Sequence, residues 1–296
     1  MNTFAVRSLL LALALPAAAL AQTPSTLDKI KQSGSMTLAY RESSIPFSYL
    51  GGDAQPTGFG FEICEKIAEK VKAATGRADM KKAYQSVTSA NRIPLLQNGT
   101  IDIECGSTTN NSDRGKQVQF ATNYFYTGTR FLVKAGTSAN KLADLAGKQV
   151  VSTTGTTNFQ IIRRLNEEQK LGIDLLGAKD HAESALMVQS GRAVAFAMDD
   201  ILLYGLKASS QNPAELAVVG EAIHVEPYAV MVRKDDPAFK KLVDDTLSGL
   251  MKSGEFEALY KKWFLSPIPP KGINLNAPMS KELIDNMKAL SDKPAT

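Results

Sequence analysis

Two stretches of the chain share one arrangement: "LLQNGTIDIEC" (residues 95–105) and "MVQSGRAVAFA" (residues 187–197). Each has an apolar pair, a glutamine and a turn glycine, followed by an apolar run that predicts a buried strand. Gln97 and Gln189 stand 92 residues apart (189 minus 97). A helix–turn–strand unit that occurs twice favours two lobes of similar architecture.

The wider pattern is that of an α/β protein, because strand-like and helical segments alternate along the chain. Apolar alternation predicts strands, and apolar residues at helical spacing predict amphipathic helices. The first series predicts strands at residues 35–43, 78–87 and 100–106 and helices at residues 61–76 and 91–99. The second series predicts strands at residues 148–154, 172–178 and 192–198 and helices at residues 157–169 and 182–191.

Two segments rich in β-forming residues connect these series. "YFYTGTRFLVKAG" (residues 124–136) is placed to cross from one lobe to the other, and "EPYAVMVRKDD" (residues 226–236) to cross back. The rest of the chain is helical, with Gly254 as an interruption, and ends in a proline-containing tail. We therefore expect a two-lobed α/β fold with two hinge strands and a ligand cleft between the lobes. The expected parts are lobe one at residues 22–128 and 227–296, and lobe two at residues 129–226.

Residues 1–21 have the pattern of a cleavable signal peptide, with Arg7 near the start, an apolar run over residues 9–20 and a small-x-small cleavage site ending at Ala21. The apolar run is too short for a membrane span, which needs about 20 residues. We expect an exported protein whose mature chain begins near Gln22. The formal net charge of +4 falls to +3 once Arg7 is removed, which is not the concentrated basicity of a nucleic-acid binder.

The two cysteines are too few for a disulfide-framework protein. Cys64 lies on the apolar face of a predicted helix, and Cys105 ends a predicted strand. A disulfide between them and two separately buried side chains both remain open, because the sequence alone does not give the distance between them.

Polar residues follow the predicted strands at the points where these strands end. In open α/β sheets, ligands bind beyond the carboxyl ends of the strands. The residues expected to face the cleft are Arg41, Ser89, Arg92 and Ser107 to Arg114 in lobe one, and Thr156, Thr157, His181, Asp199 and Asp200 in lobe two.

The arginines of lobe one suit an anionic ligand. Arg114 follows a run of hydroxyl residues, Ser107 to Thr109, and its guanidinium fork can grip a carboxylate with two parallel hydrogen bonds. Arg92 lies in the first turn of a predicted helix, where its charge opposes the helix dipole and a bound anion would remove the conflict.

Three of these residues also have purely structural interpretations. Ser89 could cap the helix that contains Arg92. Arg41 stands beside Glu42, with which it could form an exposed ion pair. Asp200 could cap the helix that follows the strand of lobe two.

In lobe two, the loop "STTGTTN" (residues 152–158) opens onto a helix but lacks the lysine of a P-loop. Thr157 fits better as a donor to a carboxylate. His181, one of two histidines in the chain, lies in the position of the repeat that Ser89 and Arg92 occupy in lobe one. Asp199 ends an apolar strand, where its carboxylate can hold an ammonium group.

These residues form a weak catalytic set and a coherent binding set. The sequence shows no serine–histidine–aspartate grouping and no metal-ligand spacing, and we expect no cofactor and no metal. Three arginines and a histidine can face two carboxylates, while one aspartate faces one ammonium. That combination describes an acidic amino acid.

At these residues the chain resembles the periplasmic solute-binding proteins for polar amino acids (solute-binding protein family 3), and within them the members that bind glutamate or aspartate for an ABC importer. The most specific stretches are "RESSIPFSY" (41–49), "TSANRIPLLQNGT" (88–100), "ECGSTTNN" (104–111), "GTTN" (155–158), "LNEEQK" (165–170), "AKDH" (178–181), "SGRAVAFAMDD" (190–200) and "KKWFLSPIPPK" (261–271). The resemblance implies the two-lobed periplasmic-binding-protein fold, a periplasmic location, a monomer and a membrane permease as partner.

The resemblance also assigns roles to residues. Ser107, Thr109 and Arg114 correspond to the clamp for the α-carboxylate, which Thr157 joins. Asp199 corresponds to the acceptor of the α-amino group. The groups for the side-chain carboxylate correspond to Arg41, Ser89, Arg92 and His181. Cys64 departs from the expected pattern, so the resemblance implies no disulfide for Cys105.

Two alternatives remain from the sequence. An exported dehydratase on the same scaffold would need a general acid or base, for which His181, Glu42 and Glu104 are the nearby candidates. The sensor domain of a receptor kinase is the other. The sequence does not rank glutamate against aspartate as the ligand.

Overall fold

The computed structural model describes residues 24–295, and the predicted signal peptide lies outside this range. The strands are β1 (Ser35–Tyr40), β2 (Ser43–Ser44), β3 (Ser48–Leu50), β4 (Pro56–Thr57), β5 (Lys81–Ser86), β6 (Ile103–Glu104), β7 (Val118–Lys134), β8 (Gln149–Thr153), β9 (Asp174–Ala178), β10 (Ala195–Asp199), β11 (Leu216–Val219) and β12 (Val225–Arg233). The helices are α1 (Thr26–Ser33), α2 (Phe59–Thr75), α3 (Arg92–Gln97), α4 (Ser112–Gly115), α5 (Thr157–Gln169), α6 (His181–Gln189), α7 (Asp200–Ser209), α8 (Pro237–Ser253), α9 (Glu255–Phe264) and α10 (Lys281–Ala289), with two 3₁₀ turns at Leu142–Leu145 and Pro213–Glu215. The prediction of alternating strands and helices is confirmed.

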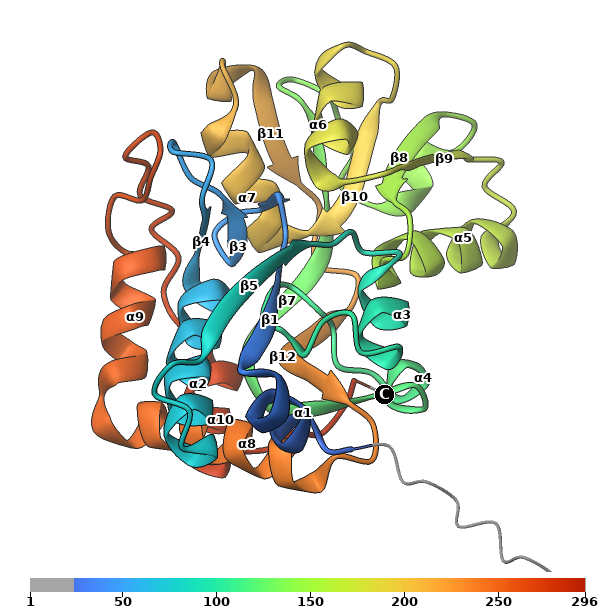
Figure 1. The fold of residues 1–296 in the computed structure, drawn as a ribbon. Helices are drawn as coiled ribbons and strands as arrows, with labels where there is room; N and C mark the ends of the chain where they lie inside the picture. Colours follow the sequence, from blue (N-terminus) through green and yellow to red (C-terminus); the bar gives the residue numbers. More distant parts are fainter. Residues whose placement is uncertain (1–23, 296) are drawn as a thin grey trace, which may run out of the picture.

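Within residues 24–295, nine strands form one sheet in the order β5-β1-β6-β12-β7-β10-β8-β9, with β11 paired to β7. Strands β2, β3 and β4 form a separate three-stranded sheet. We call β5, β1 and β6, with the helices packed on them, the first half, and β10, β8, β9 and β11, with their helices, the second half. Within each half the neighbouring strands β1 and β6, and β8 and β10, run parallel. Figure 1 shows the two halves one above the other, with β7 passing between them.

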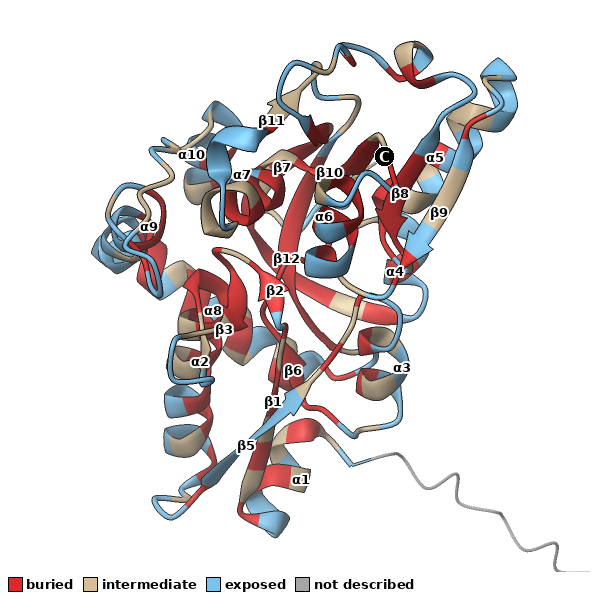
Figure 2. Ribbon diagram, turned by 90° about the horizontal axis from the view of Figure 1, so that it is seen from above, coloured by how far each residue is buried: buried red, intermediate tan, exposed pale blue. Residues whose placement is uncertain are grey.

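Strands β7 and β12 join the two halves. β12 pairs with residues 118–128 of β7, and β10 pairs with residues 129–133. β7 therefore changes its partner between Gly128 and Thr129 while it continues as one strand. Both strands are buried along most of their length, as Figure 2 shows in red.

The repeated unit predicted from the sequence is present in both halves. Gln97 is the last residue of α3, and Gln189 is the last residue of α6; each helix is followed by a glycine turn and then by β6 or β10. The two helices begin at Arg92 and His181. The repeat thus brings the start of one helix in each half to the same end of the sheet.

An aromatic cluster holds α9 against the first half. The Phe264 ring lies 5.1 Å from the Phe59 ring and 5.1 Å from that of Phe125, and it stacks on Tyr260 at 4.3 Å. Buried aromatic rings remove large apolar areas from water and prefer such edge-on or offset contacts. This packing places late-chain helices beside β7.

The two cysteines form a disulfide. Cys64 in α2 is bonded to Cys105 directly after β6, with their Cα atoms 5.6 Å apart. The bond ties α2 to the strand end from which the polar segment at residues 107–114 leaves the sheet.

One part of the fold differs from the sequence prediction. The segment after Phe264, expected as a tail, contains α10, whose Ser280 caps the helix by accepting from the backbone N–H of Leu283. The polar segment after β6 contains the short helix α4. None of the helices in residues 24–295 combines the length and apolar character needed to cross a membrane.

Candidate functional site

A small cavity lies between the two halves. Its lining consists of Ser89, Arg92, Ser107, Thr109, Arg114, Thr156, Thr157, Asn158, His181, Met198 and Asp199. Eight of the nine site residues predicted from the sequence are in this set, and Arg41 contacts two of them. The structure therefore brings all nine together.

The convergence follows from the parallel strands of each half. Arg41 follows β1, Ser107 follows β6, and Asp199 ends β10, while Thr157 and His181 begin α5 and α6. The carboxyl ends of parallel strands meet at one edge of a sheet. Because the two halves face each other at these edges, residues far apart in the sequence share one cavity.

The two halves contact each other directly across the cavity. Arg41 Nη2 lies 3.2 Å from His181 Nε2, and Arg114 Nη2 donates to the carbonyl of Gly155 at 3.1 Å. The hydroxyl oxygens of Thr109 and Thr157 are 3.4 Å apart. The structure is therefore a closed arrangement of the two halves.

Gly155 makes the closest backbone approach between the halves. Its φ is +80°, and a Cβ atom at this position would lie 2.6 Å from the Cα of Ala90 and 2.8 Å from the carbonyl carbon of Ser89. Side chains other than hydrogen do not fit at such distances. Glycine at this position allows the loop before α5 to touch the backbone before α3.

Three guanidinium groups are buried at the cavity. Arg41 and Arg92 are each 2% exposed and Arg114 is 8% exposed. Burial, and secondly the charge of Arg92, lowers the pKa of Arg41 and of Arg114 to about 9, so both remain charged at neutral pH. Arg41 Nη1 and Arg92 Nε have no hydrogen-bond partner among residues 24–295. Buried cations with unused N–H donors suit an anionic ligand.

The structural interpretations of Arg41 and Ser89 are wrong. Arg41 donates to Ser89 Oγ at 2.8 Å inside the protein, whereas Glu42 accepts a hydrogen bond from Ser86. The capping position of α3 belongs to Asn91. Ser89 thus serves the guanidinium of Arg41 and does not cap the helix.

Asp200 does not cap α7 either, because the capping position is Asp199 and Asp200 is the first helical residue. The Asp200 carboxylate accepts from the hydroxyl of Thr127 at 2.7 Å. This leaves Asp199 at the end of β10 as the carboxylate that lines the cavity.

His181 is neutral in this arrangement. A guanidinium only donates, so His181 Nε2 must accept from Arg41, and Nδ1–H then donates to the hydroxyl of Thr153, 2.9 Å away. Burial, and secondly the charge of Arg41, lowers the pKa of His181 well below its usual value. The histidine therefore adds no positive charge to the site.

Two buried carboxylates near the cavity were not among the predicted binding residues, although the sequence named Glu104 as a candidate acid or base for the dehydratase alternative. Glu104 is fully buried and accepts from the hydroxyl of Thr108 at 2.5 Å, and Glu226 is 2% exposed. With Asp199 they place three carboxyl groups beside the three arginines. The available signal in both cases was a carboxylate within a segment predicted to be a buried strand, because burial of such a group needs partners.

Asp199 is held by two donors. Asn158 Nδ2 donates to one carboxylate oxygen at 2.8 Å, and the hydroxyl of Tyr228 donates to the other. Burial, and secondly the charge of Glu226, raises the pKa of Asp199 above its usual value. A neighbouring cation would favour its ionised form.

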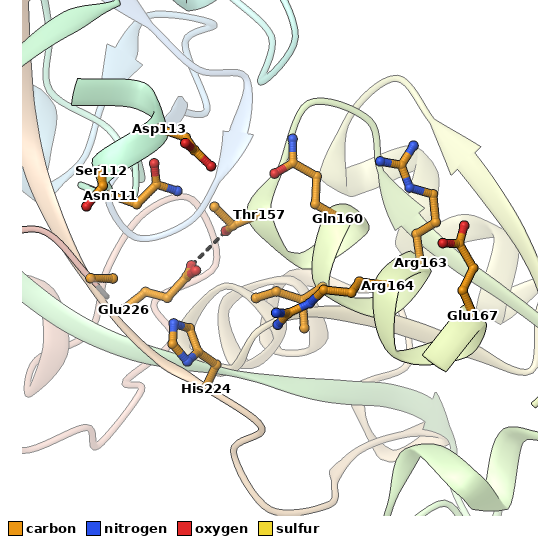
Figure 3. A pocket seen from close by; sticks show the side chains of 12 residues that line it. Asn111, Ser112, Asp113, Thr157, Gln160, Arg163, Arg164, Glu167, His224 and Glu226 are labelled. Atoms are coloured by element: carbon orange, nitrogen blue, oxygen red, sulfur yellow. Dashed lines mark hydrogen bonds between the residues drawn. The ribbon is translucent and has the colours of Figure 1, made fainter. Parts of the chain in front are cut away.

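An outer groove runs beside the cavity (Figure 3). Thr157 and Glu226, joined by a hydrogen bond, stand in its wall, and Thr157 lines the inner cavity as well. This pair therefore separates the groove from the cavity. Within residues 24–295, no group of three or more histidine, cysteine or acidic side chains is arranged to hold a metal ion.

Residues 21–266 match a protein family described as the bacterial extracellular solute-binding proteins, family 3. The chain belongs to this family, and its fold is the mixed α/β fold of periplasmic binding proteins, as predicted.

Two curated relatives match most of the chain. The L-glutamate/L-aspartate-binding protein of Pseudomonas aeruginosa is 49% identical, covering 91% of this chain and 90% of the relative. The glutamate/aspartate import solute-binding protein of Salmonella typhimurium is 47% identical, covering 91% of this chain and 89% of the relative. Among solved structures, a mutant of the arginine-binding protein from T. maritima superposes with a TM-score of 0.72 at 24% identity, covering 80% of this chain and 98% of that one, which supports the fold.

Proposed function

We propose that this protein is a periplasmic receptor that binds L-glutamate or L-aspartate and delivers it to the membrane permease of an ABC importer. The observation that carries the proposal is the meeting of three buried guanidiniums with Asp199 around one cavity. An acidic amino acid supplies two carboxylates for the arginines and one ammonium for the aspartate.

The proposed roles follow the two ends of the ligand. Arg114 and Ser107, with Thr109 and Thr157 beside them, serve the α-amino-acid end, where Asp199 accepts from the ammonium. The opposite end of the cavity serves the side-chain carboxylate through Arg41, Ser89, Arg92 and His181. His181, as the acceptor for Arg41, orients the guanidinium.

We propose that the ligand is enclosed by movement of two lobes, residues 22–128 with 227–296 and residues 129–226, about β7 and β12. The partner change within β7 supports a boundary at residues 128 and 129. The mature protein acts as a monomer in the periplasm after removal of residues 1–21.

The curated relatives that match about nine-tenths of the chain are named as binding proteins for glutamate and aspartate. These names favour a receptor over the exported dehydratase considered from the sequence. We propose no catalytic step for this site.

Calorimetric titration of the purified, ligand-stripped protein with the common amino acids tests the proposal. L-Glutamate or L-aspartate should bind, and their amides should bind poorly because a neutral amide does not form the charge-assisted hydrogen bonds that a carboxylate forms with a guanidinium. Glutamine binding as tightly as glutamate would contradict the proposal.

Two variants test the site itself. Arg92→Ala and Arg114→Ala each remove one partner of a buried ion pair, which costs about 3–5 kcal/mol and therefore weakens binding at least about 100-fold. Arg163→Ala is the matched control, because Arg163 is exposed in the outer groove, and it should bind normally. Near-normal affinity in the Arg92 or Arg114 variant would reject the assigned site.

A further inference from the structure

Glu226 contacts the site from the strand that joins the two halves. It lies in β12, opposite Thr127 of β7, and is 2% exposed. Its Oε2 atom accepts from the hydroxyl of Thr109 at 2.9 Å and from the hydroxyl of Thr157 at 2.7 Å. One oxygen atom thus receives a hydrogen bond from each half.

These two hydrogen bonds determine what the threonines offer to a ligand. A hydroxyl group has one proton to donate and two lone pairs. Because Thr109 and Thr157 donate their protons to Glu226, their oxygens present only lone pairs to the cavity. They accept hydrogen bonds there and cannot donate to a carboxylate.

Two neighbouring side chains, Asp199 and Asn158, also offer acceptors. Asp199 lies on the same side, and its pKa is raised first by burial and secondly by the charge of Glu226. Asn158 uses its amide nitrogen for Asp199 and Thr129, and its Oδ1 has no partner among residues 24–295. This corner of the cavity therefore combines negative charge with hydroxyl and amide oxygens.

We propose that Glu226 is a positioning residue that makes the site prefer a ligand with an ammonium group. By taking both threonine protons it turns Thr109 and Thr157 into acceptors, and together with Asp199 it makes this corner selective for a cationic donor. The α-carboxylate is then held by Arg114 and Ser107. The inference rests on the proposed function, since it concerns the ligand's amino group.

A different role for Glu226 predicts the opposite result. If its carboxylate occupied the place of a ligand carboxylate, removing its charge would free two donors and strengthen binding. The two roles are separated by comparing ligands with and without the amine.

The experiment is calorimetry on the mature protein with L-glutamate and with glutarate, which has both carboxylates and no amine. In Glu226→Gln, the charge is lost and the new amide nitrogen can donate to a threonine oxygen. We expect glutamate affinity to fall about 10- to 100-fold, while glutarate affinity changes less than about threefold. Glu221→Gln, at an exposed position shortly before β12, is the control and should leave both affinities unchanged.

Three outcomes overturn the inference while leaving the receptor intact: unchanged glutamate affinity in Glu226→Gln, tighter glutamate binding, or equal weakening for both ligands. Failure of the unaltered protein to bind glutamate or aspartate would reject the proposed function, and this inference with it.

Thr109→Val provides an independent measurement if Glu226→Gln does not fold, as judged by circular dichroism. It removes one acceptor and should also narrow the preference for glutamate over glutarate by about tenfold or more. An unchanged preference would overturn the inference. Where both single variants fold, the double variant should lose less of the preference for glutamate over glutarate than the product of the two single effects, because Glu226 acts through Thr109.

Discussion

Gly155→Ala should prevent full closure of the two halves. The added Cβ would lie 2.6 Å from the Cα of Ala90, where ordinary contact begins at 3.4 Å, so the loop must retreat by about 0.8 Å (3.4 minus 2.6). Both partners of this contact are backbone, so no side-chain rotation relieves it. A shift of this size takes the Arg41–His181 contact, now 3.2 Å, beyond hydrogen-bond range.

The cost follows from the bonds that span the cavity. Two charge-assisted hydrogen bonds weaken, that of Arg41 to His181 and that of Arg114 to the Gly155 carbonyl. Each is worth about 1.5–3 kcal/mol, so the loss of about 3 kcal/mol should weaken glutamate binding about 100-fold. Isothermal titration calorimetry measures it directly.

Gly147→Ala is the matched control for backbone strain. Gly147 has a φ of +69°, and its added Cβ would meet nothing within 4 Å. Both variants force alanine into a left-handed conformation, at a cost to folding of about 1–2 kcal/mol, but only Gly155→Ala obstructs closure. If Gly155→Ala binds glutamate within about threefold of the unaltered protein, the contact with Ala90 does not limit closure and the reasoning is wrong.

Three further outcomes can be measured. Replacing Cys64 and Cys105 by serine removes a cross-link between residues 41 positions apart and should lower the free energy of unfolding by about 4 kcal/mol. Urea titration measures this change, and an unchanged unfolding midpoint would refute the prediction. Burial raises the pKa of Asp199 to about 7, and the ammonium of the ligand favours the ionised carboxylate. Glutamate affinity should therefore fall as the pH decreases through about 7. Binding near that pH should release a proton from Asp199. Calorimetry in buffers of different ionisation enthalpy counts the proton, and Asp199→Asn should abolish its release. Asn286→Ala removes the amide that donates to the Asn123 carbonyl at 2.7 Å and accepts from the Ser291 N–H, and should destabilise the fold by about 1–3 kcal/mol; a thermal midpoint equal to that of the unaltered protein would contradict this.

The location of the polar residues could be predicted because it depends on local signals. Apolar runs mark the strands, and parallel strands carry the residues that follow them to one edge. The helix start at Arg92 and the one at His181 correspond because the repeated unit is continuous in sequence. No packing detail was needed for this level of prediction.

The remaining features depend on contacts between distant segments. Arg41 has an acidic neighbour in the sequence, but its actual partners are 48 and 140 residues away. Glu226 lies in a segment that reads only as a crossing strand, and its two threonine partners are 117 and 69 residues away. Helix α10 follows a proline-rich stretch that predicts irregular structure, and packing of Leu283 and Asn286 stabilises it.

Glu226 lies close to the proposed hinge in β7, so its hydrogen bonds to the two threonines would depend on how far the two halves are closed. Thr127, its partner in the strand ladder, is one residue before Gly128, where β7 is about to exchange one neighbouring strand for another. In the proposed hinge movement, a carboxylate this close to the axis would move little, whereas Thr109 and Thr157 would move apart. At least one hydroxyl would then leave Glu226, so the acceptor group for the amine would be complete only in the closed form. On this proposal, the open protein would first hold an arriving ligand through its carboxylates.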